Sequence, residues 1–286
     1  MHPLRSLVLG LVLAWGTHAQ VKEPFFFIQA SDPQFGMYAA NQGFAQETAN
    51  FEFLIATANR LRPAFVIVTG DLVNQAGDAA ETAEYLRIAA RLDRSIPLYS
   101  VAGNHDLGNE PTAASLAAYR QKFGRDYYTL RVGGMAGFVL NSAIIQAPQQ
   151  APGELERQEA WLRAELEKAR KDGVRRLVVF QHHPFFINTP EEKDAYFNIP
   201  KERRARYLAL LKEYGVSHVF AGHYHQNAVA SDAGLDMVTT GAVGMPLGNA
   251  RSGFRVVIVR STGIEHRYYD LGSIPNRIDL EKVGAR

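Results

Sequence analysis

The sequence predicts an α/β fold in which two β-sheets pack face to face and helices flank them. Two observations predict this class. Short apolar runs alternate with longer amphipathic segments over the first two-thirds of the chain, as in a buried sheet whose strands are joined by crossover helices. In the last third the apolar runs lie close together between Gly-rich or Ser-rich turns, and no repeat or linker divides the chain.

Each element of the first two-thirds is predicted from the spacing of its apolar residues. Short continuous apolar runs are expected as strands, and segments with apolar residues three or four positions apart are expected as helices. The expected strands are residues 25–30, 64–69, 98–102, 137–141, 176–181 and 217–221. The expected helices are residues 44–61, 79–92, 112–123, 155–171 and 201–214.

The last third is expected to form a second, more antiparallel sheet. Its strands are predicted at residues 227–230, 236–240, 254–259 and 265–269. We expect this sheet to pack on the first one within a single domain of residues 20–286. The segment 146–153, rich in Pro and Gln, is expected as a surface loop.

The first nineteen residues differ from the rest and predict a signal peptide, residues 1–19. Arg5 precedes an apolar run, residues 7–15, and the small residue Ala19 suits cleavage by signal peptidase. The run is shorter than the roughly 20 apolar residues that a membrane span needs, so no stable span is expected once the leader is removed. The protein is therefore expected to be exported to the periplasm or secreted; the alternative is a buried N-terminal strand or helix.

Composition excludes several classes of protein. The chain has no cysteine, which excludes disulfides, a zinc-thiolate site and a catalytic thiol. Its 31 Lys and Arg against 29 Asp and Glu leave a formal charge of +2 without a basic block. Nucleic acid is therefore not implied as a partner.

Side chains able to bind metal ions gather where five of the expected strands end. In open α/β sheets ligands bind beyond the carboxyl ends of the strands, so residues far apart in sequence become neighbours there. The clusters are Asp32-Pro33-Gln34, Gly70-Asp71 with Asn74, Gly103-Asn104-His105-Asp106, Gln181-His182-His183-Pro184 and Gly222-His223-Tyr224-His225.

Each of these residues, taken alone, has an ordinary structural explanation. A histidine at a strand end is commonly structural, Asp71 would suit a helix N-cap, and Asn104 would suit a turn. The clusters taken together do not, because five of the nine histidines fall inside them and every cluster would need its own explanation. We therefore interpret the five clusters as one site.

In this order the clusters resemble the five signature motifs of the calcineurin-like metallophosphoesterases. The resemblance spans about residues 25–269 and implies the two-sheet, helix-flanked sandwich of that family. Longer stretches are similar to one group within it, the calcineurin-like phosphoesterase domain-containing protein 1 group. These stretches are residues 31–36, 103–112, 196–200 and 266–269.

The resemblance implies a site for two divalent metal ions. It assigns Asp32, Gln34, Asp71 and His225 to the first ion and Asp71, Asn104, His182 and His223 to the second. Two dications roughly 3.5–4 Å apart need a shared carboxylate, here Asp71, and the pair activates a bridging water as the nucleophile. His105 is implied as the proton donor to the leaving oxygen or to a phosphate oxygen, with Asp106 orienting it. Asn104 and His105 are also expected to contact the substrate.

Gln34 departs from the common family motif, in which a histidine stands at this position. An amide oxygen is a neutral, hard ligand, so we expect the first site to bind metal more weakly than an imidazole would and to favour Mn²⁺ or Mg²⁺, with Fe and Zn as alternatives. The resemblance implies no role for His183.

The expected activity is metal-dependent hydrolysis of a phosphomonoester. The expected partner is a phosphorylated small molecule or a phosphoprotein, and the group resemblance implies serine/threonine phosphatase activity. Two alternatives stay open. One is a phosphodiesterase acting on nucleotides or phospholipids. The other is a non-catalytic scaffold, which is disfavoured because the candidate ligands and His105 are all present.

Overall fold

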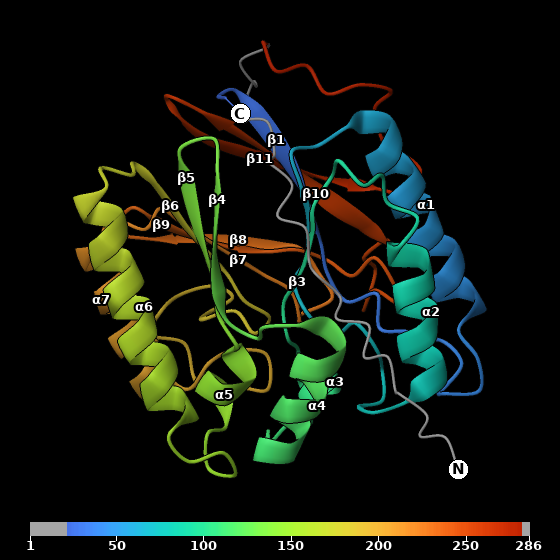
Figure 1. Cartoon of the computed structure of the whole chain (residues 1–286), viewed down its shortest axis with the longest axis horizontal. Coiled ribbons are helices and arrows are strands. Elements are labelled where there is room, and N and C mark those ends of the chain that lie inside the picture. The colour runs from blue at the N-terminus through green and yellow to red at the C-terminus, as the bar shows by residue number, and fades with distance from the viewer. Residues whose placement is uncertain (1–21, 282–286) are drawn as a thin grey trace, which may run out of the picture.

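The computed structural model describes residues 22–281, so the predicted signal peptide, residues 1–19, lies outside the described part. Two sheets face each other in the middle of the molecule, and helices cover their outer faces (Figure 1). The predicted α/β sandwich is confirmed. Among the described residues, no helix combines the length and the apolar character that crossing a membrane requires.

The first sheet has five strands in the order β11-β10-β1-β2-β3. Its parallel part consists of β1 (Phe25–Ala30), β2 (Val66–Val68) and β3 (Leu98–Ser100). The strands β10 (Gly253–Arg260) and β11 (Gly263–Asp270) form an antiparallel hairpin that pairs with β1.

The second sheet has six strands in the order β4-β5-β6-β7-β9-β8. Four of them are parallel: β5 (Met135–Val139), β6 (Arg176–Phe180), β7 (His218–Ala221) and β9 (Leu235–Thr239). Antiparallel strands close both edges, β4 (Tyr128–Val132) and β8 (Ala228–Asp232).

The last third does not form a separate sheet, so that prediction was wrong. The hairpin of β8 and β9 extends the second sheet, whereas the hairpin of β10 and β11 extends the first. Turn residues specify a hairpin locally, but which sheet edge receives it depends on contacts with distant strands.

The helices lie in two outer layers. In Figure 1, α1 (Ala45–Leu61) and α2 (Ala79–Ala89) cover one side of the sandwich, and α6 (Glu154–Lys171) and α7 (Lys201–Glu213) cover the other. The helix α4 (Ala113–Phe123) agrees with its prediction, with Thr112 as its N-cap. Three elements were not predicted: β4, α3 (Asn104–Leu107) and α5 (Ser142–Gln146). The two helices are too short to show a period, and β4 is only partly buried.

Aromatic rings fill the space between the sheets. On the side of the first sheet, the rings of Phe27 and Phe65 stack with their centroids 4.6 Å apart. In the second sheet, the rings of Phe180 and Phe220 stack with their centroids 5.5 Å apart. Phe27 meets Phe180 edge-on at 5.6 Å, and all four side chains are fully buried. This layer fixes the two sheets against each other and thereby sets the spacing of the loops at their ends.

Candidate metal centre

The loops after β1, β2, β3, β6 and β7 meet at one end of the sandwich. At these loops the chain turns sharply: Asp32, Gln34, Asp71, His223 and His225 all have φ between 41° and 66°. They are five of the nine non-glycine residues with positive φ in the described part of the chain. This backbone conformation costs energy for residues with a Cβ, and such strain concentrates at functional sites because the surrounding structure must impose it.

Two glycines let these loops approach each other. A Cβ at Gly103 would collide with the backbone nitrogen and Oδ1 of Asp71, and a Cβ at Gly222 would collide with the hydroxyl of Ser31 and come within 2.7 Å of Asp32 Oδ2. Glycine is therefore required wherever one loop passes directly over a carboxylate of another. The Gly-Asn-His-Asp and Gly-His-Tyr-His stretches contain their glycines for this reason.

The first group of candidate ligands is Asp32, Asp71 and His225. One donor atom from each lies within 4.8 Å of the others, and all three side chains are buried. His225 Nε2 is 3.4 Å from Asp32 Oδ1. Gln34 lies beside this group: its backbone nitrogen donates to the carbonyl of Asp71 at 2.9 Å, its side chain is 1% exposed, and its Nε2 donates to Asn74 Oδ1 at 3.0 Å.

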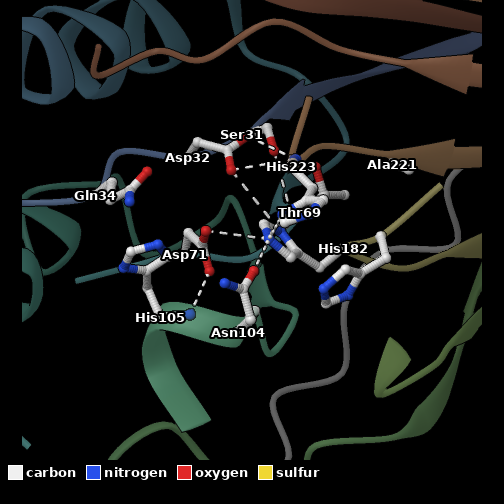
Figure 2. Close-up of polar contacts among 12 residues, drawn as sticks. Ser31, Asp32, Gln34, Thr69, Asp71, Asn104, His105, His182, Ala221 and His223 are labelled. Carbon is white, nitrogen blue, oxygen red and sulfur yellow. Dashed lines mark hydrogen bonds and ion pairs between the residues drawn. The ribbon is translucent and has the colours of Figure 1, made fainter. Parts of the chain in front are cut away.

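The second group is Asp71, His182 and His223, again with donor atoms within 4.8 Å of one another. His182 Nε2 lies 3.1 Å from Asp71 Oδ2 and 3.0 Å from Asn104 Oδ1. His223 Nδ1 is 3.2 Å from His182 Nε2. Asp71 thus belongs to both groups, and Figure 2 shows its carboxylate among the labelled side chains, with Asp32 to one side and Asn104 to the other.

Each candidate histidine has its second ring nitrogen held by a backbone carbonyl. His182 Nδ1 lies 2.8 Å from Thr69 O, His225 Nδ1 lies 2.6 Å from Met245 O, and His223 Nε2 lies 2.9 Å from Tyr196 O. Because a carbonyl only accepts, the proton sits on that nitrogen in the neutral ring and the other nitrogen is left with its lone pair. This arrangement is the one that metal-binding histidines use to fix their tautomer.

The electrostatics of the site favour a cation. Burial raises the pKa of Asp71, but the neighbouring His182 outweighs it and holds this pKa well below its usual range. Burial lowers the pKa of His182, and Asp71 outweighs that effect and raises it to about 9. Burial and His182 together lower the pKa of His223 to about 4. The carboxylates of Asp71 and Asp32, 3.1 and 3.9 Å from the His182 ring nitrogens, therefore favour positive charge here, which a dication would supply.

The residues present fit divalent metal ions. Gln34 Oε1 is buried and has no hydrogen-bond partner, although an unpaired buried acceptor is costly. The amide and carboxylate oxygens are ligands that Mn²⁺ and Mg²⁺ prefer, and the imidazole nitrogens are ligands that suit Zn²⁺ and Fe. An ion in the first group would give Gln34 Oε1 the partner that it lacks.

His105 lies beside the groups rather than within them. Its ring is half-buried, its backbone nitrogen donates to Asp71 Oδ1 at 2.9 Å, and its Nδ1 lies 2.7 Å from Asn74 O. His105 is in neither group of candidate ligands, and its predicted role as the proton donor stays a prediction.

Asp106 does not orient His105, so that assignment is corrected. Its Oδ1 accepts from the backbone nitrogens of Leu72 and Val73 at 2.9 and 3.2 Å, and its Oδ2 accepts from Gly103 N at 2.8 Å. Burial and the charge of Asp71 raise the pKa of Asp106 to about 8. The Asp106 carboxyl ties the loop after β2 to the loop after β3, and the carbonyl of Asn74 orients His105 instead.

His183, to which the sequence assigned no role, is 3% exposed and packs its ring 4.2 Å from the ring of His223. Its Nδ1 lies 3.0 Å from Ser142 Oγ, which accepts from the backbone nitrogens of His182 and His183 at 3.1 and 2.8 Å. Burial lowers the pKa of His183 well below its usual value, followed by the charge of His223. His183 is therefore a neutral ring that supports the candidate ligands.

Sequence reasoning missed three residues that contact the site: Ser142, Asn109 and Tyr196. Asn109 and Tyr196 fall within stretches noted for their group resemblance, but no pattern indicated their partners. Ser142 had no sequence signal, because only the fold places the start of α5 under His182.

Comparison with known proteins identifies the family. The sequence profile described as calcineurin-like phosphoesterase matches residues 27–227. The chain belongs to the calcineurin-like phosphoesterase family. This phosphoesterase acts on phosphoric ester bonds, as the sequence predicted, and the scaffold alternative is set aside.

Individual proteins similar to this chain include phosphatases and a probable phosphodiesterase. It is 38% identical over 278 residues to serine/threonine-protein phosphatase CPPED1 of Danio rerio, covering 91% of this chain and 90% of that protein. It is 28% identical over 163 residues to a protein of Fibrobacter succinogenes named probable cyclic nucleotide phosphodiesterase, covering 56% of this chain and 57% of that protein. A solved dimetal phosphatase from Danio rerio has the same fold, with a TM-score of 0.66 at 14% identity over 87% of this chain and 97% of that one.

Proposed function

We propose that this phosphoesterase is a metal-dependent phosphomonoesterase that removes phosphate from serine and threonine residues of proteins. The observation that carries the reaction is the position of Asp71, which belongs to both groups of candidate ligands and accepts from the backbone nitrogen of His105. The likeness to CPPED1 over nearly the whole chain supports the choice of substrate.

Two divalent ions would be held as the resemblance implies. The first has Asp32, Gln34, Asp71 and His225 as ligands, and the second has Asp71, Asn104, His182 and His223. When bound, such a pair supplies Lewis-acid polarisation of phosphoryl oxygens and a water nucleophile of lowered pKa. The amide oxygens of Gln34 and Asn104 favour Mn²⁺ or Mg²⁺, with Fe and Zn as alternatives.

His105 is the residue placed to move a proton. Its Nδ1 donates to the carbonyl of Asn74, so a second proton on Nε2 makes the ring an acid that can protonate the departing serine or threonine oxygen. The half-buried ring has access to a bound substrate while its backbone is anchored to Asp71. Asn104 precedes His105 at the start of α3; the sequence also predicted a phosphate contact for it, but its amide N–H groups donate to Asn109 and Tyr196.

The proposal is tested with the purified protein after metal removal and reconstitution with Mn²⁺. Phosphoserine and phosphothreonine peptides should be hydrolysed, EDTA should abolish the activity, Asp71→Asn should reduce it to background, and His105→Ala should lower kcat by about 100-fold or more. His218→Gln, at a histidine outside the site, is the matched control. Unchanged activity in Asp71→Asn would overturn the proposal.

Phosphodiester hydrolysis is the second candidate function, favoured by the likeness to the Fibrobacter succinogenes protein. The two functions use the same ligands and differ in the charge and size of the ester. Rates on p-nitrophenyl phosphate and bis(p-nitrophenyl) phosphate under Mn²⁺ separate them. A much faster rate on the diester would replace the monoesterase proposal.

We also propose export, because residues 1–19 have the charge, apolar run and small terminal residue of a signal peptide. The exported protein should begin at Gln20 or within a few residues of it, as N-terminal sequencing of periplasmic or secreted protein would show. A mature cytoplasmic form that retains Met1 would contradict export.

A further inference from the structure

Two sequence stretches converge on the amide of Asn104. Asn104 Nδ2 donates to Asn109 Oδ1 at 2.9 Å and to the hydroxyl of Tyr196 at 3.2 Å. Asn104 Oδ1 points the other way and lies 3.0 Å from His182 Nε2, inside the second group of candidate ligands. Asn109 comes from the loop after α3, and Tyr196 comes from the segment between β6 and α7.

These two contacts decide which end of the amide faces the site. An asparagine amide has an acceptor end and a donor end of nearly equal size, and only the oxygen can bind a cation. Both N–H groups of Asn104 are used by partners on the outer side. A flipped amide would lose both bonds and would turn its N–H groups towards the ligands.

Tyr196 fixes a second candidate ligand as well. Its carbonyl oxygen lies 2.9 Å from His223 Nε2, and its ring packs 4.8 Å from the ring of His223. The carbonyl holds the proton on Nε2 and leaves the lone pair of Nδ1 facing His182. One residue therefore orients two donor atoms of the second group.

Polar contacts among residues 190–204 hold the segment that carries Tyr196 in place. Arg204, which is fully buried, donates to the carbonyls of Pro190, Glu192 and Ile199. Asn198 Nδ2 donates to Glu192 Oε1 at 2.7 Å. Tyr196 itself is 54% exposed, so its hydroxyl can be removed without opening the core.

We propose that Tyr196 and Asn109 are positioning residues that set which atoms of Asn104 and His223 face the metal-binding group. The inference rests on the proposed use of that group to hold a metal ion, and it adds two residues that the family motifs do not include.

The test is calorimetric titration of metal-free full-length protein with Mn²⁺. Tyr196→Phe and Asn109→Leu should each weaken one of the two Mn²⁺ sites by about tenfold, which is typical when an outer partner of a ligand is lost. Asn109→Asp keeps an acceptor at the same place and should retain the affinity of the original protein. Tyr214→Phe is the matched control, because its hydroxyl donates to the exposed Glu167 of α6, outside the site.

Kinetics with p-nitrophenyl phosphate at limiting Mn²⁺ give a second readout. Tyr196→Phe should lower kcat about tenfold, in proportion to the lost metal, and leave KM unchanged. Unaltered Mn²⁺ affinity in both Tyr196→Phe and Asn109→Leu, or an equal loss in Asn109→Asp and Asn109→Leu, would overturn the proposal. If the Mn²⁺ shifts occur but the original protein hydrolyses no phosphoester, the positioning role stands and the proposed function fails.

Discussion

Replacing Gln34 with methionine separates the cost of this residue in the metal-free protein from its benefit in the metal-bound one. Gln34 Oε1 is buried and unpaired, which costs about 1–3 kcal/mol. Methionine has nearly the same shape and removes this acceptor, and it loses the bond from Nε2 to Asn74 Oδ1, worth about 1 kcal/mol. The metal-free Gln34→Met protein should therefore be about 0–2 kcal/mol more stable than the original.

With Mn²⁺ this gain should shrink or be lost, because a thioether is a poor ligand for this hard ion. A tenfold weaker first site removes about 1.4 kcal/mol of metal-linked stabilisation at saturating Mn²⁺. Urea unfolding in EDTA and in Mn²⁺ measures both effects, and Gln149→Met in the exposed loop is the control. Equal stabilisation by Mn²⁺ in Gln34→Met and the original would show that Gln34 is not a ligand. A metal-free variant clearly less stable than the original would refute the reasoning about its unpaired oxygen.

Three further predictions concern the surroundings of the site. Gly103→Ala should destabilise the protein by about 1–3 kcal/mol in thermal unfolding, because its Cβ would collide with Asp71. Gly263→Ala is the control, because there is open space around Gly263. Equal effects of the two substitutions would contradict the packing argument. Ser142→Ala should lower the free energy of unfolding by about 1–3 kcal/mol, because it leaves the backbone N–H groups of His182 and His183 without their acceptor. An unchanged stability in urea unfolding would reject this role. Burial, followed by the charge of Arg255, lowers the pKa of His266 to about 4, so the unfolded chain binds the proton first as pH falls below 6.5. Stability should therefore decrease between pH 6.5 and 4 by up to about 3 kcal/mol, less in His266→Gln; the same pH dependence in both proteins would contradict this assignment.

The predicted helices and parallel strands agree well with the structure because their signals are local. The amphipathic period of residues 155–171 predicts α6 to within one residue at its start, and the apolar run of residues 25–30 coincides with β1. β4 escaped prediction because only Leu130 of its five residues is buried, so its sequence lacks a clear apolar pattern. The last four strands were predicted, but their division between the two sheets depends on strands that lie far away in sequence.

The candidate site could be predicted as a set of residues because each ligand type stands at a strand end. Its internal arrangement could not, as Asp106 shows: the order of residues suggested a partner for His105, whereas the fold directs both carboxyl oxygens to the backbone of neighbouring loops. The same holds for the unpaired oxygen of Gln34 and for the contacts of Tyr196 with Asn104 and His223.

By itself, the sequence predicted the fold class from the period of its apolar residues, and it predicted the family and the candidate ligands from the resemblance of its five clusters to known motifs. The tertiary structure alone decided that carbonyls select the donor nitrogen of each histidine, and that Asn74 and not Asp106 holds His105. These features depend on atoms brought together from separate loops, and the packing of the two sheets sets their distances.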